Sequence, residues 1–224
     1  MRASCPICER RRGKRFCPGL AASRWSAKGK GETICAQCCG EQREVTIDCP
    51  AHCTYLLAAH RYEGERPKSV KEPALPRVSI TEEFLEEKSH LVAGLSVALA
   101  QSARATAGAR DPDAVEALEA LAQNYQTLDS GLYYEQAPRS IGAAQALFAA
   151  LKAFLEQLGQ EQQKRVGTSL RPGDVLRAAV FLRRLAQLET NGRPLSRRFL
   201  EFLGRQVPAG GKASDEPRLI VPGA

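Results

Sequence analysis

The stretch CAQCCGEQREVTIDCPAHC, residues 35–53, places five cysteines and a histidine within nineteen residues, and two of the cysteines are adjacent. Three more cysteines precede it, so all eight cysteines of the 224-residue chain lie before residue 54. The only tryptophan also lies in this part, whereas the rest is rich in Ala, Leu, Gln and Arg. This uneven composition predicts two unlike units.

The cysteine spacing predicts metal binding. The chain opens without the apolar stretch of a secretory signal, and closely spaced cysteines in a reducing cytosol are typically metal ligands or catalytic groups rather than disulfides. Two C-x2-C pairs suit knuckles, which are tight turns that aim both sulfurs at one ion. Eight thiolates fill two tetrahedral sites, so we expect two structural zinc ions. The expected ligands are Cys5, Cys8, Cys17, Cys35, Cys38, Cys39, Cys49 and Cys53.

Two divisions of these ligands are open. The preferred one joins Cys5, Cys8, Cys35 and Cys38 at one ion and Cys17, Cys39, Cys49 and Cys53 at the other. The competing one joins Cys35 and Cys38 to Cys49 and Cys53 and leaves the other four together. His52 is a candidate replacement for one cysteine.

Local patterns predict the structure around these ligands. Residues 44–48 alternate polar and apolar side chains, which predicts a short strand with Val45 and Ile47 facing inward. Proline follows Cys49, which predicts that a helix starts there, with Cys49 and Cys53 on one face of its first turn. In an extended segment the adjacent Cys38 and Cys39 would point to opposite sides and serve two different ions. A knuckle, a strand and a ligand-bearing helix are the layout of a treble-clef site.

Residues 5–53 loosely resemble the two-zinc fingers of the HIT and MYND kind. The likeness rests on Cys5-x2-Cys8-x8-Cys17 and on the closing His/Cys pair, and the long gap after Cys17 and the adjacent cysteines depart from it. The segments CPIC, ICAQCCG, REV, IDCP and YL are also similar to those of a bacterial family of zinc-binding proteins without an assigned activity. That resemblance implies a zinc-binding front end.

The remainder of the chain is expected to be helical. A Ser-x-x-Glu pattern at Ser79 predicts a capping box with one helix after it. Asp111-Pro112 predicts the start of the next helix. Later helices are expected from about residue 139, after residue 172 and after Ser196. The fold class is therefore mainly α, with a small two-zinc N-terminal domain of treble-clef or cross-brace kind and a bundle of four to five helices. We expect the zinc domain at 1–66, a linker at 67–78, the bundle at 79–206 and a disordered tail at 207–224.

The sequence disfavours an enzyme. A closed set of thiolates leaves no position for substrate or water, and the zinc hydrolase and deaminase signatures and the nucleotide-binding loops are absent. The longest uncharged run in the helical part, starting at Leu91, is too short to cross a bilayer. We therefore expect a soluble, cytoplasmic, non-catalytic zinc protein that acts as a protein-interaction adaptor or scaffold and could self-associate through its helices.

Nucleic-acid binding is the alternative. Residues 1–72 carry 14 Lys+Arg against 8 Asp+Glu, which is +6 of the net charge of +7. Eight thiolates and two zinc ions would reduce this unit to about +2, so the local basic run matters more than the total charge. Candidate contacts to DNA or RNA are Arg10, Arg11, Arg12, Lys14, Arg15, Arg24, Trp25, Lys28 and Lys30.

Overall fold

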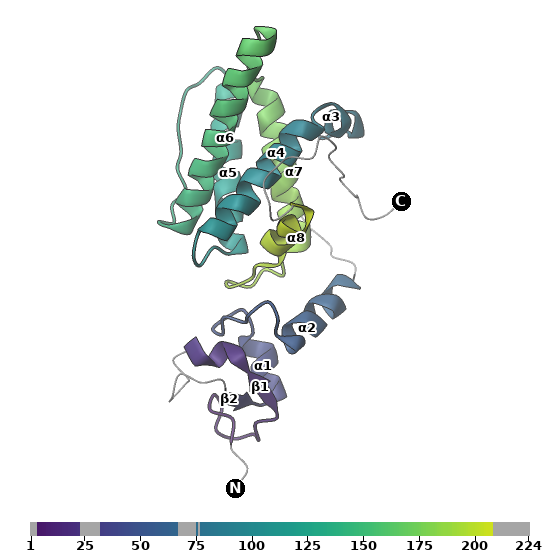
Figure 1. Cartoon of the computed structure of the whole chain (residues 1–224), viewed down its shortest axis with the longest axis vertical. Helices are drawn as coiled ribbons and strands as arrows, with labels where there is room; N and C mark the ends of the chain where they lie inside the picture. The colour runs from purple at the N-terminus through teal and green to yellow at the C-terminus, as the bar shows by residue number, and fades with distance from the viewer. Residues whose placement is uncertain (1–3, 23–31, 67–74, 76, 208–224) are drawn as a thin grey trace. The chain divides into compact units, whose positions relative to one another are not determined.

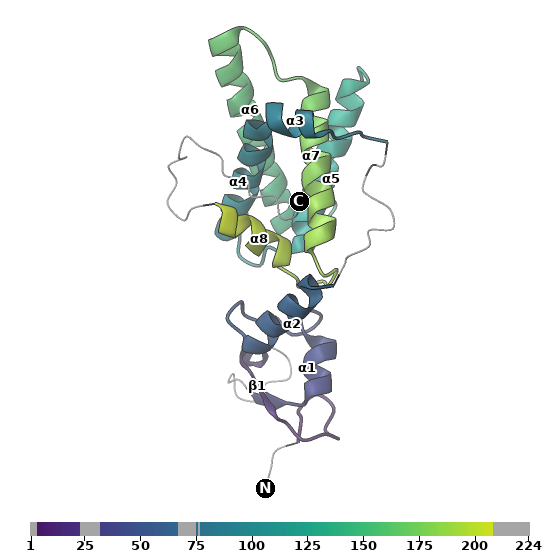
Figure 2. The same ribbon diagram turned by 90° about the vertical axis from the view of Figure 1, so that its right-hand side faces the viewer.

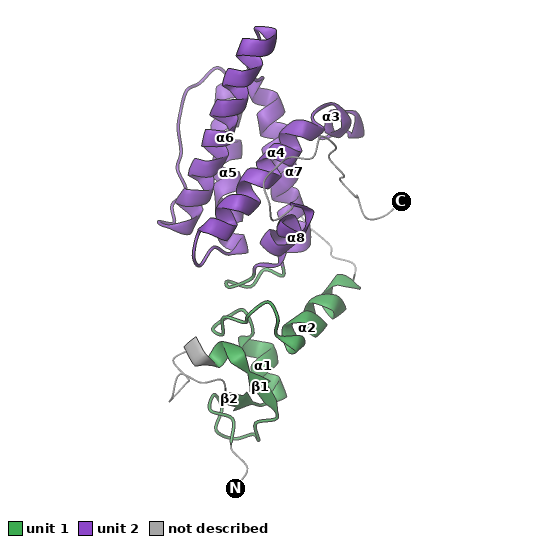
Figure 3. Ribbon diagram, viewed as in Figure 1, with its two compact units in different colours: residues 1–69, 191–196 green, residues 70–190, 197–224 purple. Residues whose placement is uncertain are grey.

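The computed structural model of the chain describes residues 4–22, 32–66, 75 and 77–207. The predicted linker at 67–78 lies largely outside the described residues, and so does the predicted tail from residue 208 onward. The described part divides into two compact units (Figure 3), one of residues 1–69 and 191–196 and the other of 70–190 and 197–224.

The first unit contains two short strands and two helices. Strand β1 (Arg15–Cys17) pairs antiparallel with β2 (Glu32–Ile34), and Phe16 lies opposite Thr33. A 3-10 helix, η1 (Pro18–Ala22), follows β1 directly, α1 (Ala36–Gln42) follows β2, and α2 (Thr54–Gly64) ends the described part of residues 1–69. The apolar interior is small: Leu20, Ile34 and Ile47 are buried together with cysteines.

The second unit is a helical bundle. Its helices are α3 (Glu82–Glu87), α4 (Ser89–Ala105), α5 (Asp111–Asp129), α6 (Ala143–Val166), α7 (Pro172–Glu189) and α8 (Arg198–Gln206). Figures 1 and 2 show α4, α5, α6 and α7 side by side, with α8 against one end of α4. No helix of the described residues combines the length and hydropathy needed to cross a membrane.

Apolar side chains at helical spacing form the core of this bundle. Leu91, Leu95 and Leu99 lie three to four positions apart on α4 and are buried, and Leu118 and Leu121 repeat the pattern on α5. Asp111 is buried at the start of α5, and its carboxylate accepts hydrogen bonds from the N–H groups of Phe199 and Leu200 in α8. These bonds satisfy N–H groups that an isolated helix start would leave unpaired. The prediction of a mainly α chain with an N-terminal cysteine-rich region is confirmed.

Two local predictions for the bundle are wrong. The single helix expected after Ser79 is divided at Lys88 into α3 and α4, and its N-cap is Thr81, whose hydroxyl accepts the N–H of Phe84 at 3.2 Å. The helix expected from about residue 139 starts at Ala143. Its preceding residues are held elsewhere, because the Glu116 carboxylate accepts the N–H groups of Arg139 and Ser140.

Two predictions around the cysteines are also wrong. Residues 44–46 form a turn instead of a strand, because the N–H groups of residues 45–47 all donate to the carbonyl of Gln42. Val45 is 39% exposed, whereas Ile47 is buried as predicted. The helix expected at Cys49 starts at Thr54, with Cys53 as its N-cap, so Cys49 lies outside the first turn. Sequence patterns did not reveal the β1–β2 pair.

Candidate metal centre

Four cysteines from two separate segments come together in the first unit. The ligand atoms of Cys5, Cys8, Cys35 and Cys38 all lie within 4.8 Å of one another, and the Cys8 and Cys35 sulfurs are 4.0 Å apart. A tetrahedral zinc with Zn–S bonds of about 2.3 Å holds its sulfurs about 3.8 Å apart. The spacing of this group, the Cys5 cluster, therefore suits a tetrahedral ion, and it matches the first site of the preferred division.

Two tight turns aim these sulfurs at one point. Cys35 is the N-cap of α1, and its sulfur accepts the N–H of Cys38 at 3.4 Å. On the other side, the N–H of Glu9 donates to the carbonyl of Cys5, which closes the turn between Cys5 and Cys8. Each turn is a knuckle of the kind that the C-x2-C spacing predicts.

Backbone and guanidinium donors favour thiolates at the Cys5 cluster. The N–H groups of Arg11 and Arg10, together with the Arg11 side chain, lower the pKa of Cys8 to about 6. Arg11 also donates to the Cys38 sulfur at 3.9 Å. The thiolate of Cys8 in turn raises the pKa of Arg11.

The four sulfurs do not all ionise easily without a further cation. Burial and the sulfurs of Cys35 and Cys8 together raise the pKa of Cys38 to about 12. Burial would also raise the pKa of Cys35, but the N–H and thiol of Cys38 outweigh it, so the pKa of Cys35 is lowered. A divalent cation at the centre would supply the charge that lets all four ionise.

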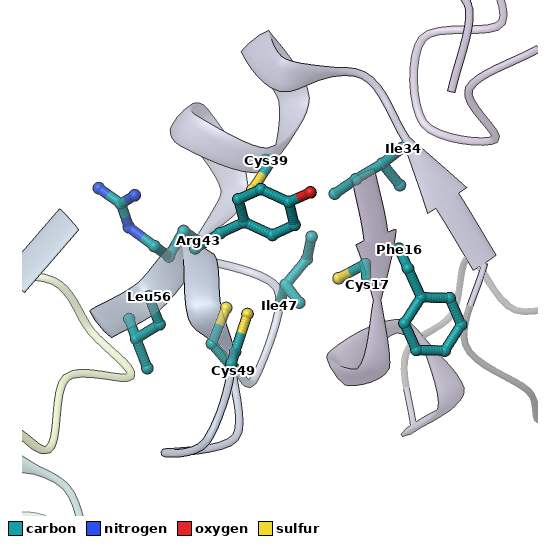
Figure 4. Close-up of a pocket in the computed structure, with 10 residues that line it drawn as sticks. Phe16, Cys17, Ile34, Cys39, Arg43, Ile47, Cys49 and Leu56 are labelled. Carbon is teal, nitrogen blue, oxygen red and sulfur yellow. The ribbon is translucent and has the colours of Figure 1, made fainter. Parts of the chain in front are cut away.

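The other four cysteines line one cavity of about 10 Å³ in the same unit (Figure 4). We call Cys17, Cys39, Cys49 and Cys53 the Cys17 group. This volume is about that of one water-sized occupant. The sulfurs are less tightly gathered than those of the Cys5 cluster, which is the one group of three or more potential ligands within 4.8 Å among the described residues.

A close approach between two segments brings members of the Cys17 group to the same cavity. Gly19 follows Cys17, and a Cβ atom at Gly19 would lie 2.5 Å from the carbonyl oxygen of Asp48. Glycine therefore allows the turn after Cys17 to approach the residue before Cys49. Cys38 and Cys39 belong to helix α1, not to an extended segment as predicted, yet they still serve the Cys5 cluster and the cavity respectively.

Burial raises the pKa values of two cysteines in the Cys17 group, and backbone N–H donors lower them. Burial raises the pKa of Cys17, against the N–H groups of Leu20 and Gly19, and the charges of Cys39 and Cys53 raise it further. Burial likewise raises the pKa of Cys49 to about 12, against the N–H of Glu44. His52 is exposed and does not line the cavity.

The residues predicted to contact nucleic acid divide into three sets. Arg10, Arg12 and Lys14 are exposed. Arg11 reaches the Cys5 cluster, and the guanidinium of Arg15 lies 4.7 Å from the centre of the Tyr55 ring. The rest lie outside the described residues, namely Arg24, Trp25, Lys28 and Lys30.

Sequence reasoning missed a buried carboxylate beside the cavity. Glu44 is 3% exposed and has a positive φ of 54°. Its Oε2 atom lies 3.1 Å from His60 Nε2 and accepts a hydrogen bond from the Asn191 amide at 2.7 Å, and its carbonyl accepts the N–H of Leu195. These bonds help to place residues 191–196, predicted as part of the bundle domain, in the first unit. No local signal marks Glu44, because Asn191 is 147 positions away.

Comparison with known proteins found no matching family model, no similar curated protein and no similar solved structure. The cysteine cluster is consistent with a zinc-finger-like module, and no family match assigns it to a particular type. Function must therefore be argued from the site itself.

Proposed function

We propose that this protein is a non-catalytic adaptor. In this proposal the cysteine-rich unit is a structural zinc module and the helical unit carries a partner-binding surface. The observation that carries the zinc assignment is the Cys5 cluster, which offers four sulfurs at tetrahedral spacing. Four thiolates complete the coordination of zinc, whereas catalytic zinc sites usually keep one position open for water.

The proposal includes a second zinc ion at the Cys17 group. Its support is the shared cavity and the backbone N–H groups directed at Cys17 and Cys49, which resemble the donors around the Cys5 cluster. Cys53 stands at the N-terminus of α2, where the helix dipole favours a negative sulfur. Binding would require these four sulfurs to lie closer together than they do in the structure.

Elemental analysis of the purified chain and its variants tests both ions. We expect two zinc ions per chain, and one in each of the variants Cys35→Ser and Cys49→Ser. Glu41→Gln, an exposed change on α1, serves as the control and should retain both. A native content of one zinc that only Cys35→Ser abolishes would overturn the second site, and a chain purified without zinc would overturn the module.

Exposed apolar side chains support the adaptor role. Between α5 and α6, Leu132 is 65% exposed, Tyr133 86% and Tyr134 61%. Neighbouring exposed apolar residues commonly mark interaction sites. Affinity capture from cells should therefore yield a partner that the double variant Leu132→Ser/Tyr133→Ser no longer retains.

A matched change elsewhere keeps this test specific. Val166, at the end of α6, is 70% exposed, and Val166→Ser should retain the partner. Sedimentation of the purified chain distinguishes a second copy from another protein, because self-association would appear without any added partner. Equal capture by all variants would contradict this surface.

Nucleic-acid binding is the second candidate, favoured by one observation. Phe16 is 59% exposed in the segment that also carries the exposed Arg12 and Lys14, and an exposed ring beside cations can stack on a base. Binding through about five phosphates would weaken steeply between low and moderate salt. Failure to retain DNA or RNA at low salt would remove this candidate.

A further inference from the structure

The helical unit contains a second cavity, of about 140 Å³, between α5, α6 and the segment that joins them. Its lining includes three tyrosines and three charged residues, namely Tyr125, Tyr133, Tyr134, Glu135, Lys152 and Glu156. An engineered cavity of about 150 Å³ holds a benzene molecule. The space therefore suits one planar group of a few atoms.

The segment that carries two of these rings is held against α5. The Asn124 amide donates to the carbonyl of Gln136 at 2.9 Å, and the N–H of Gln136 donates back to the Asn124 side chain at 2.6 Å. The Thr127 hydroxyl also donates to the carbonyl of Tyr134 at 3.4 Å. The backbone is therefore fixed while Tyr133 and Tyr134 remain mostly exposed at the cavity.

The charges around the cavity favour a cation. Lys152 forms an ion pair with Glu135. Glu156 forms no ion pair within 4 Å among the described residues, and the three groups together carry a net charge of −1. Burial raises the pKa of Tyr125, the negative charge of Glu156 raises it further, and the positive charge of Lys152 lowers it. Aromatic faces add to this preference, because their electron density attracts cations.

We propose that this cavity binds the guanidinium group of an arginine side chain presented by a protein partner. A guanidinium is planar, stacks on tyrosine rings and donates two parallel hydrogen bonds to one carboxylate. An anionic group would face two carboxylates, Glu156 and Glu135, against the one ammonium of Lys152, and a neutral ring would leave the net charge of −1 unbalanced. This inference rests on the proposed adaptor function and names the chemistry that its partner would present.

Ring-resolved NMR of the full chain tests the inference with small probes. N-acetyl-arginine methylamide should shift the tyrosine ring signals in a saturable way. N-acetyl-citrulline methylamide has nearly the same shape without the charge, and we expect it to bind at least about tenfold more weakly. Glu156→Gln should weaken arginine binding by up to about fivefold, because an ion pair at an exposed carboxylate is lost. Glu161→Gln, on an exposed site of the same helix, should bind like the native chain.

Four results would overturn the inference. Equal binding of the arginine and citrulline probes would show that the cavity does not select a cation. Equal effects of Glu156→Gln and Glu161→Gln would show that the Glu156 carboxylate does not contact the probe. Tighter binding of butylguanidinium than of the capped arginine would point to a free small cation instead of a protein side chain. These probes need no captured partner, so a partner captured without any probe binding would overturn the pocket inference and leave the adaptor proposal intact.

Discussion

The two units of this chain achieve a buried interior in different ways. In the cysteine-rich unit the main buried cluster holds five cysteines and three other apolar residues, whereas the bundle buries leucines, alanines, valines and phenylalanines from six helices. Small domains bury too little apolar surface to be stable without further links. We propose on this basis that metal stabilises the first unit, whereas side-chain packing stabilises the second.

Metal removal should give the largest difference in stability between the two units. Structural zinc contributes roughly 10–16 kcal/mol of folding free energy in small zinc domains. A strong chelator should therefore abolish hydrogen-exchange protection in residues 32–66 and leave α4–α7 protected, as mass spectrometry of peptides can measure. Adding zinc should restore protection, and adding magnesium should not. Unchanged protection in residues 32–66 after complete zinc removal would contradict a structural role for the metal.

A large-to-small substitution in the bundle core should have the opposite effect, because it should destabilise the bundle and leave the zinc content of the first unit unchanged. Leu118 is fully buried on α5, so Leu118→Ala should lower the free energy of unfolding by about 2–5 kcal/mol through lost contacts and a cavity. Zinc content should not change. Thermal and denaturant unfolding would measure the loss, and Leu128→Ala, at a site that is 39% exposed, provides the control. A loss of zinc in Leu118→Ala would show that the units do not have separate sources of stability.

The Glu44 carboxylate should make the first unit sensitive to acid. Burial alone would raise its pKa, but hydrogen bonds from His60 and Asn191 and the charges of His60 and Arg43 outweigh burial, so the folded-state pKa is lowered. Its stabilisation is therefore present at neutral pH and is lost as the pH falls below about 4.

Glu44→Gln measures this contribution. We expect a loss of about 1.5–3 kcal/mol at neutral pH, because hydrogen bonds to a buried charge are weakened, and a smaller loss at low pH. Unfolding followed by circular dichroism gives the difference between the two chains at each pH, and elemental analysis at the same pH values reports whether both chains still hold zinc. The exposed Glu41→Gln variant should behave like the native chain. Equal losses for Glu44→Gln at neutral and acid pH would refute the electrostatic explanation.

The smallest expected effect concerns the start of the bundle. Thr81→Ala should cost about 1 kcal/mol, because the hydroxyl caps the N–H of Phe84. Ser79→Ala should cost almost nothing, although the sequence pattern favours Ser79 as the cap. Thermal unfolding of the two variants compares them directly, and the reverse order would mean that the cap is Ser79 after all.

The sequence predicts short-range features well in both units. Leucine spacing predicts helices near α4, α5 and α7, and the C-x2-C pairs predict the two knuckles of the Cys5 cluster. These features depend on residues three or four positions apart, so local patterns are sufficient to reveal them.

The predictions that failed depend on backbone hydrogen bonds, which side-chain alternation does not report, and on distant partners. Residues 44–48 alternate polar and apolar side chains as a strand does. Their backbone N–H groups instead donate to the carbonyl of Gln42, and the Glu44 carboxylate forms hydrogen bonds with His60 and Asn191. The close approach of Gly19 to Asp48 likewise has no signature in the sequence. Part of the boundary between the units follows from such contacts, since residues 191–196 join the cysteine-rich unit.

X-ray absorption at the zinc edge of the purified full chain tests most directly that the cysteine-rich unit is a structural zinc module. We predict a first coordination shell of four sulfurs at about 2.3 Å from each zinc and no nitrogen or oxygen ligand. A shell that contains a bound water or a histidine nitrogen would contradict a closed thiolate site.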